Sequence, residues 1–190
     1  MSTSSAYSNN YLEYLTDLIS QLDREAIGQF ADLLLESRES STTTFFLGNG
    51  GSASTATHFV NDVSLGSRQF EKPFRAISLC DNQAVITAIA NDDGYENIFL
   101  QQLQTLAKPG DNIVCISASG NSKNLIKAVE YAKDNGTLQL KKYIPIDVDK
   151  KEFDSVCQSE WFMPDKYKDI NVYKYVLGKA HKPCPKHVQD

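Results

Sequence analysis

The chain has 190 residues, of which 41% are hydrophobic and 23% are charged, a composition typical of a globular protein with one sizeable core. Its net charge of −5 gives no support for nucleic-acid binding through a basic surface. The first ten residues are polar and lack the apolar core of a signal peptide, and no apolar run is long enough to cross a membrane. None of the cysteines has C-x-x-C spacing, which favours reduced thiols. We therefore expect a cytoplasmic protein that forms a single domain over residues 1–190.

Apolar residues at helical spacing predict a helical N-terminal segment within residues 1–40. The pattern runs over residues 11–36 and is broken near Asp23 and Arg24, so it indicates one long helix or two shorter ones. Such helices either cover the sheet of their own subunit or pack against another subunit. We expect both in part.

From residue 45 onward, predicted strands alternate with predicted helices. The expected strands are residues 45–47, 75–79, 113–116, 143–146 and 160–163. The expected helices are residues 53–63, 82–90, 97–107, 124–135, 151–157 and 170–181, the last ended by Pro183 and Pro185. A polar turn is expected at Asn91–Glu96. This alternation predicts a three-layer α/β/α sandwich around a parallel sheet.

Two loops rich in glycine and serine each stand between a predicted strand and a predicted helix. The glycine loop is Gly48–Ser52 and the serine loop is Ser117–Ser122. The unpaired N–H groups and the dipole at a helix N-terminus attract a phosphate. The serine loop alone is equally consistent with an ordinary N-cap cluster. Two such loops at the carboxyl ends of parallel strands favour a small phosphorylated ligand, and the absence of both nucleotide fingerprints disfavours a dinucleotide or a nucleoside triphosphate.

His58 and Asp62 lie four residues apart on the helix that follows the glycine loop, so they share one face of that helix. An imidazole and a carboxylate beside a phosphate pocket suit proton transfer or metal ligation. A surface pair without a role is the alternative, and the position after the glycine loop favours the functional interpretation.

At these residues the chain resembles a known family. The segments Gly48–Ser52, His58–Asp62, Asn91–Tyr95 and Ser117–Ser122 are similar, in order and spacing, to the signature blocks of the sugar isomerase (SIS) domain, and more narrowly of phosphoheptose isomerases. The resemblance covers about residues 10 to 137. It implies a flavodoxin-like fold and a homotetramer with active sites at subunit interfaces. It also implies conversion of sedoheptulose 7-phosphate to D-glycero-D-manno-heptose 7-phosphate, which supplies heptose for a surface polysaccharide.

The resemblance also implies roles for individual residues. Asp62, where the family usually has a glutamate, would be the catalytic base, and His181 its acid partner. Some family members bind zinc, for which the corresponding ligands here are His58, Asp62 and His181. The implied substrate-binding residues are Asn49, Gly50, Ser52, Asp92, Ser117, Ser119 and Ser122.

The C-terminal part, residues 138–190, departs from the family pattern. Tyr173 stands where the family has a glutamine or glutamate, and the match of His181 rests on aligning Pro164 with the proline after the family's last strand. This part is a divergent but working version, a version that has lost catalysis, or the product of a shifted reading frame.

Two further functions remain open beside the isomerase. The first is a non-catalytic SIS-domain protein that senses a sugar phosphate or, as one relative does, binds the replication initiator DnaA. The second is an isomerase of another sugar phosphate, such as a hexosamine, because these loops recognise the phosphate more than the length of the sugar.

Overall fold

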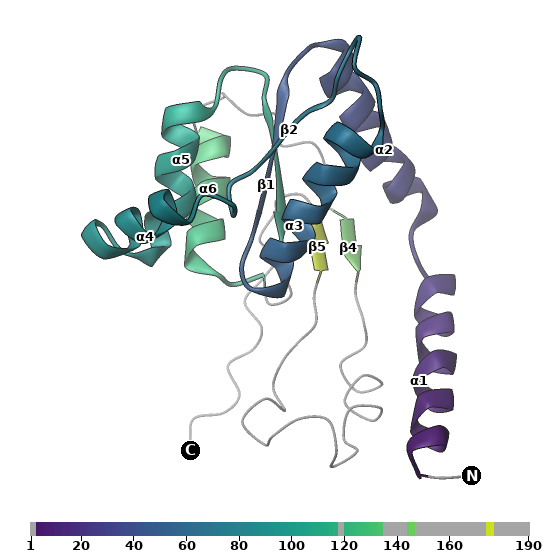
Figure 1. The fold of residues 1–190 in the computed structure, drawn as a ribbon. Helices are drawn as coiled ribbons and strands as arrows, with labels where there is room; N and C mark the ends of the chain where they lie inside the picture. The colour runs from purple at the N-terminus through teal and green to yellow at the C-terminus, as the bar shows by residue number, and fades with distance from the viewer. Residues whose placement is uncertain (1–2, 118–119, 135–143, 147–173, 177–190) are drawn as a thin grey trace.

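Two helices precede the first strand in the computed structural model, which describes residues 3–117, 120–134, 144–146 and 174–176 (Figure 1). They are α1 (Thr3–Ser20) and α2 (Arg24–Glu39). The break predicted near Asp23 is confirmed, because the Asp23 carboxylate accepts a hydrogen bond from Ala26 N at 3.0 Å and caps α2.

The central sheet is parallel and has the order β2-β1-β3. Its strands are β1 (Thr43–Gly48), β2 (Arg75–Ser78) and β3 (Asn112–Ile116), so the three expected strands in this region are confirmed to within two residues at each end. The order of these three strands is the one that begins a flavodoxin-like sheet. β1 is buried along its whole length because it has a strand on either side and helices on both faces.

Four helices connect or follow these strands. α3 (Gly51–Asn61) continues into a π-helical turn, η1 (Asp62–Gly66). α4 (Gln83–Asp92) leads through a 3₁₀ turn, η2 (Tyr95–Asn97), into α5 (Ile98–Leu106), and α6 (Lys123–Asp134) follows β3.

The polar turn expected at Asn91–Glu96 begins later than predicted. Asp92 is the last residue of α4, because the Asp93 N–H still donates to the Ile89 carbonyl at 2.9 Å. The helix stops where Gly94 takes a φ of +93°, which glycine adopts without strain.

The side chains of β1 alternate between two hydrophobic layers, which confirms the three-layer sandwich. Phe45 and Leu47 pack with residues of α5 and α6 on one face, among them Phe99, Leu103 and Ala128. On the other face, Phe46 packs with Leu33 of α2 and Ala56 of α3, and its ring stacks on Phe59 with 5.5 Å between the centroids.

The C-terminal part differs from the sequence expectation. β4 (Ile144–Ile146) lies within an expected strand, but it pairs antiparallel with β5 (Lys174–Val176) and does not extend the parallel sheet. The helix expected at residues 170–181 is therefore wrong at Lys174–Val176. Tyrosine and valine favour extended backbone, and pairing with β4 supplies the hydrogen bonds that a helix would otherwise provide. The expected elements at 151–157 and 160–163 lie outside the described residues.

The two N-terminal helices have different surroundings. α2 buries Ala26 and Leu33, whereas α1 extends beyond the sheet (Figure 1) and exposes Leu12 and Ile19, each at 58%. The covering of the sheet by α2 agrees with one half of the sequence expectation. A membrane-spanning helix was not found in the part of the chain that the structure describes.

Asp111 connects the turn before β3 to the start of β1. Its side chain is buried, and its two oxygens accept from Thr43 N and Lys108 N at 2.7 Å each. A buried carboxylate is stable only when its oxygens have donors, and here both donors are backbone N–H groups.

We predict that Asp111→Asn lowers the free energy of unfolding by about 1–3 kcal/mol, because the amide keeps one acceptor and turns an NH₂ group toward the other backbone N–H. Urea unfolding followed by circular dichroism measures this change. Asp32→Asn, on an exposed position of α2, is the matched control and should change stability by less than about 0.5 kcal/mol. Equal effects of the two variants would contradict the role given to Asp111.

Candidate functional site

The glycine loop makes a turn from β1 into α3 that only glycine permits. A Cβ atom on Gly48 would lie 2.5 Å from the Ser52 carbonyl oxygen, a contact that no side chain can relieve. Gly50 has φ +54° and ψ −124°, a conformation that costs other residues several kcal/mol or is closed to them. Ser52 N donates to Asn49 O at 3.0 Å, which closes the loop and starts the helix.

The serine loop leads from β3 into α6. Ser117 is buried, and its hydroxyl oxygen accepts from Gly120 N at 3.0 Å. The Ser122 carbonyl accepts from Leu125 N and Ile126 N at 3.0 Å, so Ser122 stands at the N-terminus of α6. The Ser117 hydroxyl therefore shapes the loop, and Ser122 is at the place where a helix attracts an anion. Ser119 lies outside the described residues.

The two loops are joined by a pair of side-chain amides that are 75 residues apart in the sequence. Asn49 Nδ2 donates to Asn124 Oδ1 at 3.0 Å, and Asn124 Nδ2 donates back to Asn49 Oδ1 at 2.8 Å. Tyr95, in η2, donates its hydroxyl hydrogen to Asn49 Oδ1 at 2.9 Å. The glycine loop, the serine loop and η2 thus meet at the carboxyl end of the sheet.

Asn124 and Tyr95 were not among the sequence-predicted site residues. Asn124 stands two residues after the serine loop, in the first turn of the amphipathic helix α6. Its near-complete burial, at 2% exposed, is the signal that distinguishes it, and only the structure gives that signal. Tyr95 belongs to one of the four family segments, but the resemblance implies no site role for it.

His58 and Asp62 share one face of α3, as predicted. His58 Nε2 lies 3.1 Å from Asp62 Oδ2, with 74% and 61% of the two side chains exposed. Asp62 is also the first residue of the π-helical turn η1. Such turns are rare in proteins, and those that occur are often at functional sites. The pair is therefore open to a ligand or to another subunit.

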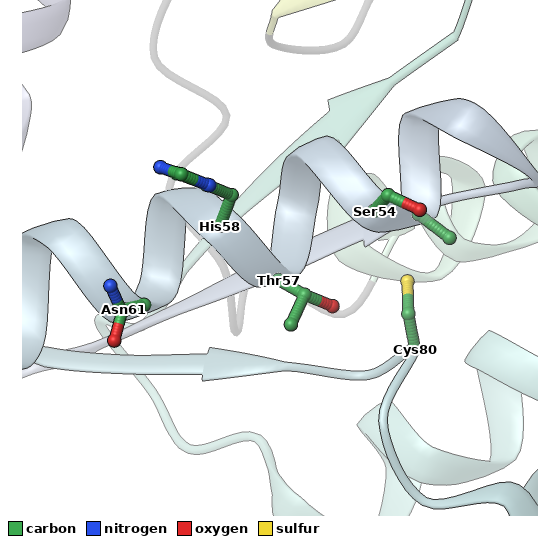
Figure 2. A pocket seen from close by; sticks show the side chains of 6 residues that line it. Ser54, Thr57, His58, Asn61 and Cys80 are labelled. Carbon is green, nitrogen blue, oxygen red and sulfur yellow. The ribbon is translucent and has the colours of Figure 1, made fainter.

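A hollow of about 500 Å³ lies between α3 and the end of β2. Its lining residues are Ala53, Ser54, Thr57, His58, Asn61 and Cys80. In Figure 2, Thr57 and Cys80 lie on the β2 side of α3 and the His58 ring points the other way. Thr57 Oγ1 is 3.2 Å from Ser78 Oγ and donates to Asp81. These hydrogen bonds hold the lining residue Thr57 to the end of β2.

Both described cysteine thiols have a raised pKa. Burial raises the pKa of Cys80, whose thiol donates to the Gly48 carbonyl at 3.4 Å. Burial also raises the pKa of Cys115 to about 12, so this thiol stays protonated at neutral pH. Cys157 and Cys184 lie outside the described residues.

Asp92 occupies a different place from the one expected. It ends α4 instead of lying in a loop, and its side chain accepts from Asn91 Nδ2 at 2.7 Å. From this region of the chain, the side chain that reaches the glycine loop is that of Tyr95.

The described residues do not by themselves fit a zinc ion. No cluster of three or more histidine, cysteine, aspartate or glutamate side chains with metal-binding geometry occurs among them. His58 and Asp62 supply two donors, whereas catalytic zinc takes three from the protein. The third expected ligand, His181, lies outside the described residues.

Comparison with known proteins identifies the relatives of this chain. The model of the SIS domain family matches residues 6–138. A probable phosphoheptose isomerase of Thermoplasma acidophilum is 43% identical over 126 residues, which are 66% of this chain and 69% of that protein. The phosphoheptose isomerase of Helicobacter pylori strain P12 is 43% identical over 113 residues, and the match spans 59% of its length, less than two thirds.

Two solved structures are similar in fold. The phosphoheptose isomerase from Francisella tularensis superimposes with a TM-score of 0.65 at 30% identity, covering 72% of this chain and 73% of that one. The phosphoheptose isomerase from Neisseria gonorrhoeae gives a TM-score of 0.61 at 30% identity, covering 71% of this chain and 68% of that one.

We predict that Gly48→Ala destabilises the fold by more than about 2 kcal/mol, because the added methyl group meets the backbone of Ser52 and β1 or α3 must shift. Gly28→Ala is the matched control: nothing lies within 4 Å of its Cβ position in α2, and it should stabilise by about 0.5–1 kcal/mol. Thermal unfolding of both variants measures the difference. A Gly48→Ala variant as stable as the parent would contradict the close approach.

Proposed function

The chain belongs to the SIS domain family and, within it, to the phosphoheptose isomerases, and from this premise we propose that it isomerises sedoheptulose 7-phosphate to D-glycero-D-manno-heptose 7-phosphate. The observation that carries the proposal is the joining of the two loops through Asn49 and Asn124. It holds two helix N-termini at one edge of the sheet, where a phosphorylated sugar can be bound at its phosphate and along its hydroxyl groups.

In this proposal the serine loop binds the phosphate. The N–H groups at the start of α6 and the hydroxyls of Ser119 and Ser122 donate to the phosphate oxygens, and Ser52 adds a donor from the start of α3. Ser117 shapes the loop through its bond to Gly120. Asn49, Gly50 and Asp92 are the proposed contacts to the sugar.

Asp62 is the proposed base. Its carboxylate takes a proton from C1 of the ketose, an enediol forms, and the protonated carboxyl returns a proton to C2 to give the aldose. O2 gains a proton when the enediol forms, and O1 loses one when the enediol becomes the aldose. His181 is the proposed group that moves this proton from O1 to O2. His58 Nε2, at 3.1 Å from Asp62 Oδ2, limits the rotation of the carboxylate.

A zinc ion at this site would need a third protein ligand beside His58 and Asp62, and His181 is the candidate that the family resemblance gives. When bound, zinc would polarise an oxygen of the substrate. The proton transfer described here does not depend on the metal.

We also propose that the active form is a homotetramer. α1 exposes Leu12 and Ile19, and the His58–Asp62 pair is open on the surface of one subunit. A second copy that covers α1 would bury the apolar side chains and exclude water from such a pair.

The direct test of the isomerase is to incubate the protein with sedoheptulose 7-phosphate and follow the aldose by NMR. We predict product with the parent protein and a loss of about 10²–10⁴-fold in rate with Asp62→Asn, which cannot accept the proton. Asp32→Asn, exposed on α2, is the control and should keep the parent rate.

Three results would contradict the proposal. Equal rates for Asp62→Asn and the parent would remove Asp62 as the base. No product from the parent, together with a melting temperature raised by the sugar phosphate, would indicate a non-catalytic binding protein. Product from a hexosamine phosphate and none from the heptose would identify a different substrate.

For the tetramer, we predict that the double variant Leu12→Glu and Ile19→Glu sediments as a smaller species than the parent, because charged groups replace the apolar face of α1. Leu106→Glu, 45% exposed at the end of α5, is the matched control and should sediment as the parent does. A monomeric parent protein at micromolar concentration would contradict the proposed assembly.

A further inference from the structure

The hydrogen bonds between the two loops have a fixed direction, and the direction is set at one end by the backbone. Leu125 N, which also donates to the Ser122 carbonyl, lies 3.0 Å from Asn124 Oδ1 and donates to it. A backbone N–H can only donate, so Asn124 must turn its oxygen toward α6 and its NH₂ group toward the glycine loop. Because Asn124 is 2% exposed, water cannot replace these partners at low cost.

The orientation of Asn124 determines that of Asn49. Asn124 Oδ1 also accepts from Asn49 Nδ2, and Asn124 Nδ2 donates to Asn49 Oδ1. If the Asn49 amide were turned over, oxygen would face oxygen and NH₂ would face NH₂ at about 3 Å. Only one orientation of Asn49 is therefore compatible with the fold.

Tyr95 adds a second constraint on the same amide. Its hydroxyl lies 2.9 Å from Asn49 Oδ1, and since that oxygen can only accept, the hydroxyl is the donor. η2, which carries Tyr95, is held against α6 by Lys127, whose Nζ donates to Asn97 Oδ1 at 2.8 Å. Asn49 Oδ1 thus accepts from two side chains that are themselves held in place.

We propose that Asn124 and Tyr95 are positioning residues that orient the Asn49 amide so that it offers the substrate an N–H and not a carbonyl. Asn49 Nδ2 carries two hydrogens; Asn124 takes one, and the second is the donor for an oxygen of the sugar. Because Tyr95 lies in η2 and contacts the glycine loop, the phosphate held by the serine loop does not depend on it. This inference rests on the proposed function, which sets Asn49 beside the sugar.

The test is a double-mutant cycle on isomerisation of sedoheptulose 7-phosphate, with inorganic phosphate as a competitive inhibitor. Tyr95→Phe removes one exposed hydroxyl, and we expect it to lower kcat/KM about three- to tenfold while leaving the melting temperature and the inhibition constant of phosphate within error. In the Asn49→Ala background, Tyr95→Phe should cost nothing further, because the group that it orients is gone. Asn124→Ala should show the same lack of additivity with Asn49→Ala.

Thr105→Val, which removes a hydroxyl from an exposed position of α5, is the matched control and should leave kcat/KM unchanged. Equal losses from Tyr95→Phe in the parent and in the Asn49→Ala background would overturn the proposal, as would a parallel weakening of phosphate inhibition. If Asn124→Ala does not fold, the double-mutant cycle of Tyr95→Phe with Asn49→Ala is sufficient to test the proposal. If the parent protein does not isomerise the sugar, the proposed function fails. The positioning is then tested by the same cycle, with the affinities for sedoheptulose 7-phosphate and for inorganic phosphate measured by calorimetry.

Discussion

The contact between Gly48 and the backbone of Ser52 is the constraint on which the site depends. Because Gly48 has no side chain, its backbone can approach that of Ser52 closely, and the chain leaves β1 and enters α3 within a single tight turn. α3 then packs back over β1, where Phe59 stacks on Phe46, and its outer face carries His58 and Asp62. The same turn leaves Asn49 at the edge of the sheet, within reach of Asn124. One glycine thus sets the positions of both the proposed base and the loop that meets the sugar.

The proposed phosphate site is built from backbone N–H groups and hydroxyls. The ends of β1 and β3 each deliver the N-terminus of a helix to the same edge of the sheet, in a chain whose net charge is −5. Lys127 of α6 bonds to Asn97 and lies 3.7 Å from Glu96, so its charge is partly neutralised within the fold. Anion binding by helix N-termini depends on local dipoles and N–H donors, so it does not require a net positive charge on the protein.

Local sequence patterns were sufficient for most of the fold. The strands around Phe45, Ile77 and Val114 and the break at Asp23 follow from apolar runs, helical spacing and a capping residue. The helix predicted at residues 170–181 is wrong at Lys174–Val176, because this segment forms a strand that pairs with β4. The polar residues at Asn91–Glu96 predict a loop that includes Asp92, but the hydrogen bond from Asp93 N to the Ile89 carbonyl continues the helix through Asp92.

The candidate site could be predicted only in part. The glycine and serine loops have a local signature, since glycine and hydroxyl residues between a strand and a helix are typical of turns that bind an anion. The pairing of Asn49 with Asn124 joins residues 75 apart and has no local signature. The donor role of Tyr95 depends on that pairing, so it became visible only with the two loops in place.

The most direct test of the proposed mechanism is to run the isomerisation in D₂O and measure deuterium at C2 of the aldose by NMR. A proton held on the Asp62 carboxylate during the enediol stage can exchange for a deuteron before a proton is returned to C2. Proton transfer through Asp62 therefore predicts an aldose that carries deuterium at C2. Asp62→Asn should lose this labelled product together with its activity, and deuterium entering C2 at the parent rate in Asp62→Asn would contradict the role of Asp62 as the base.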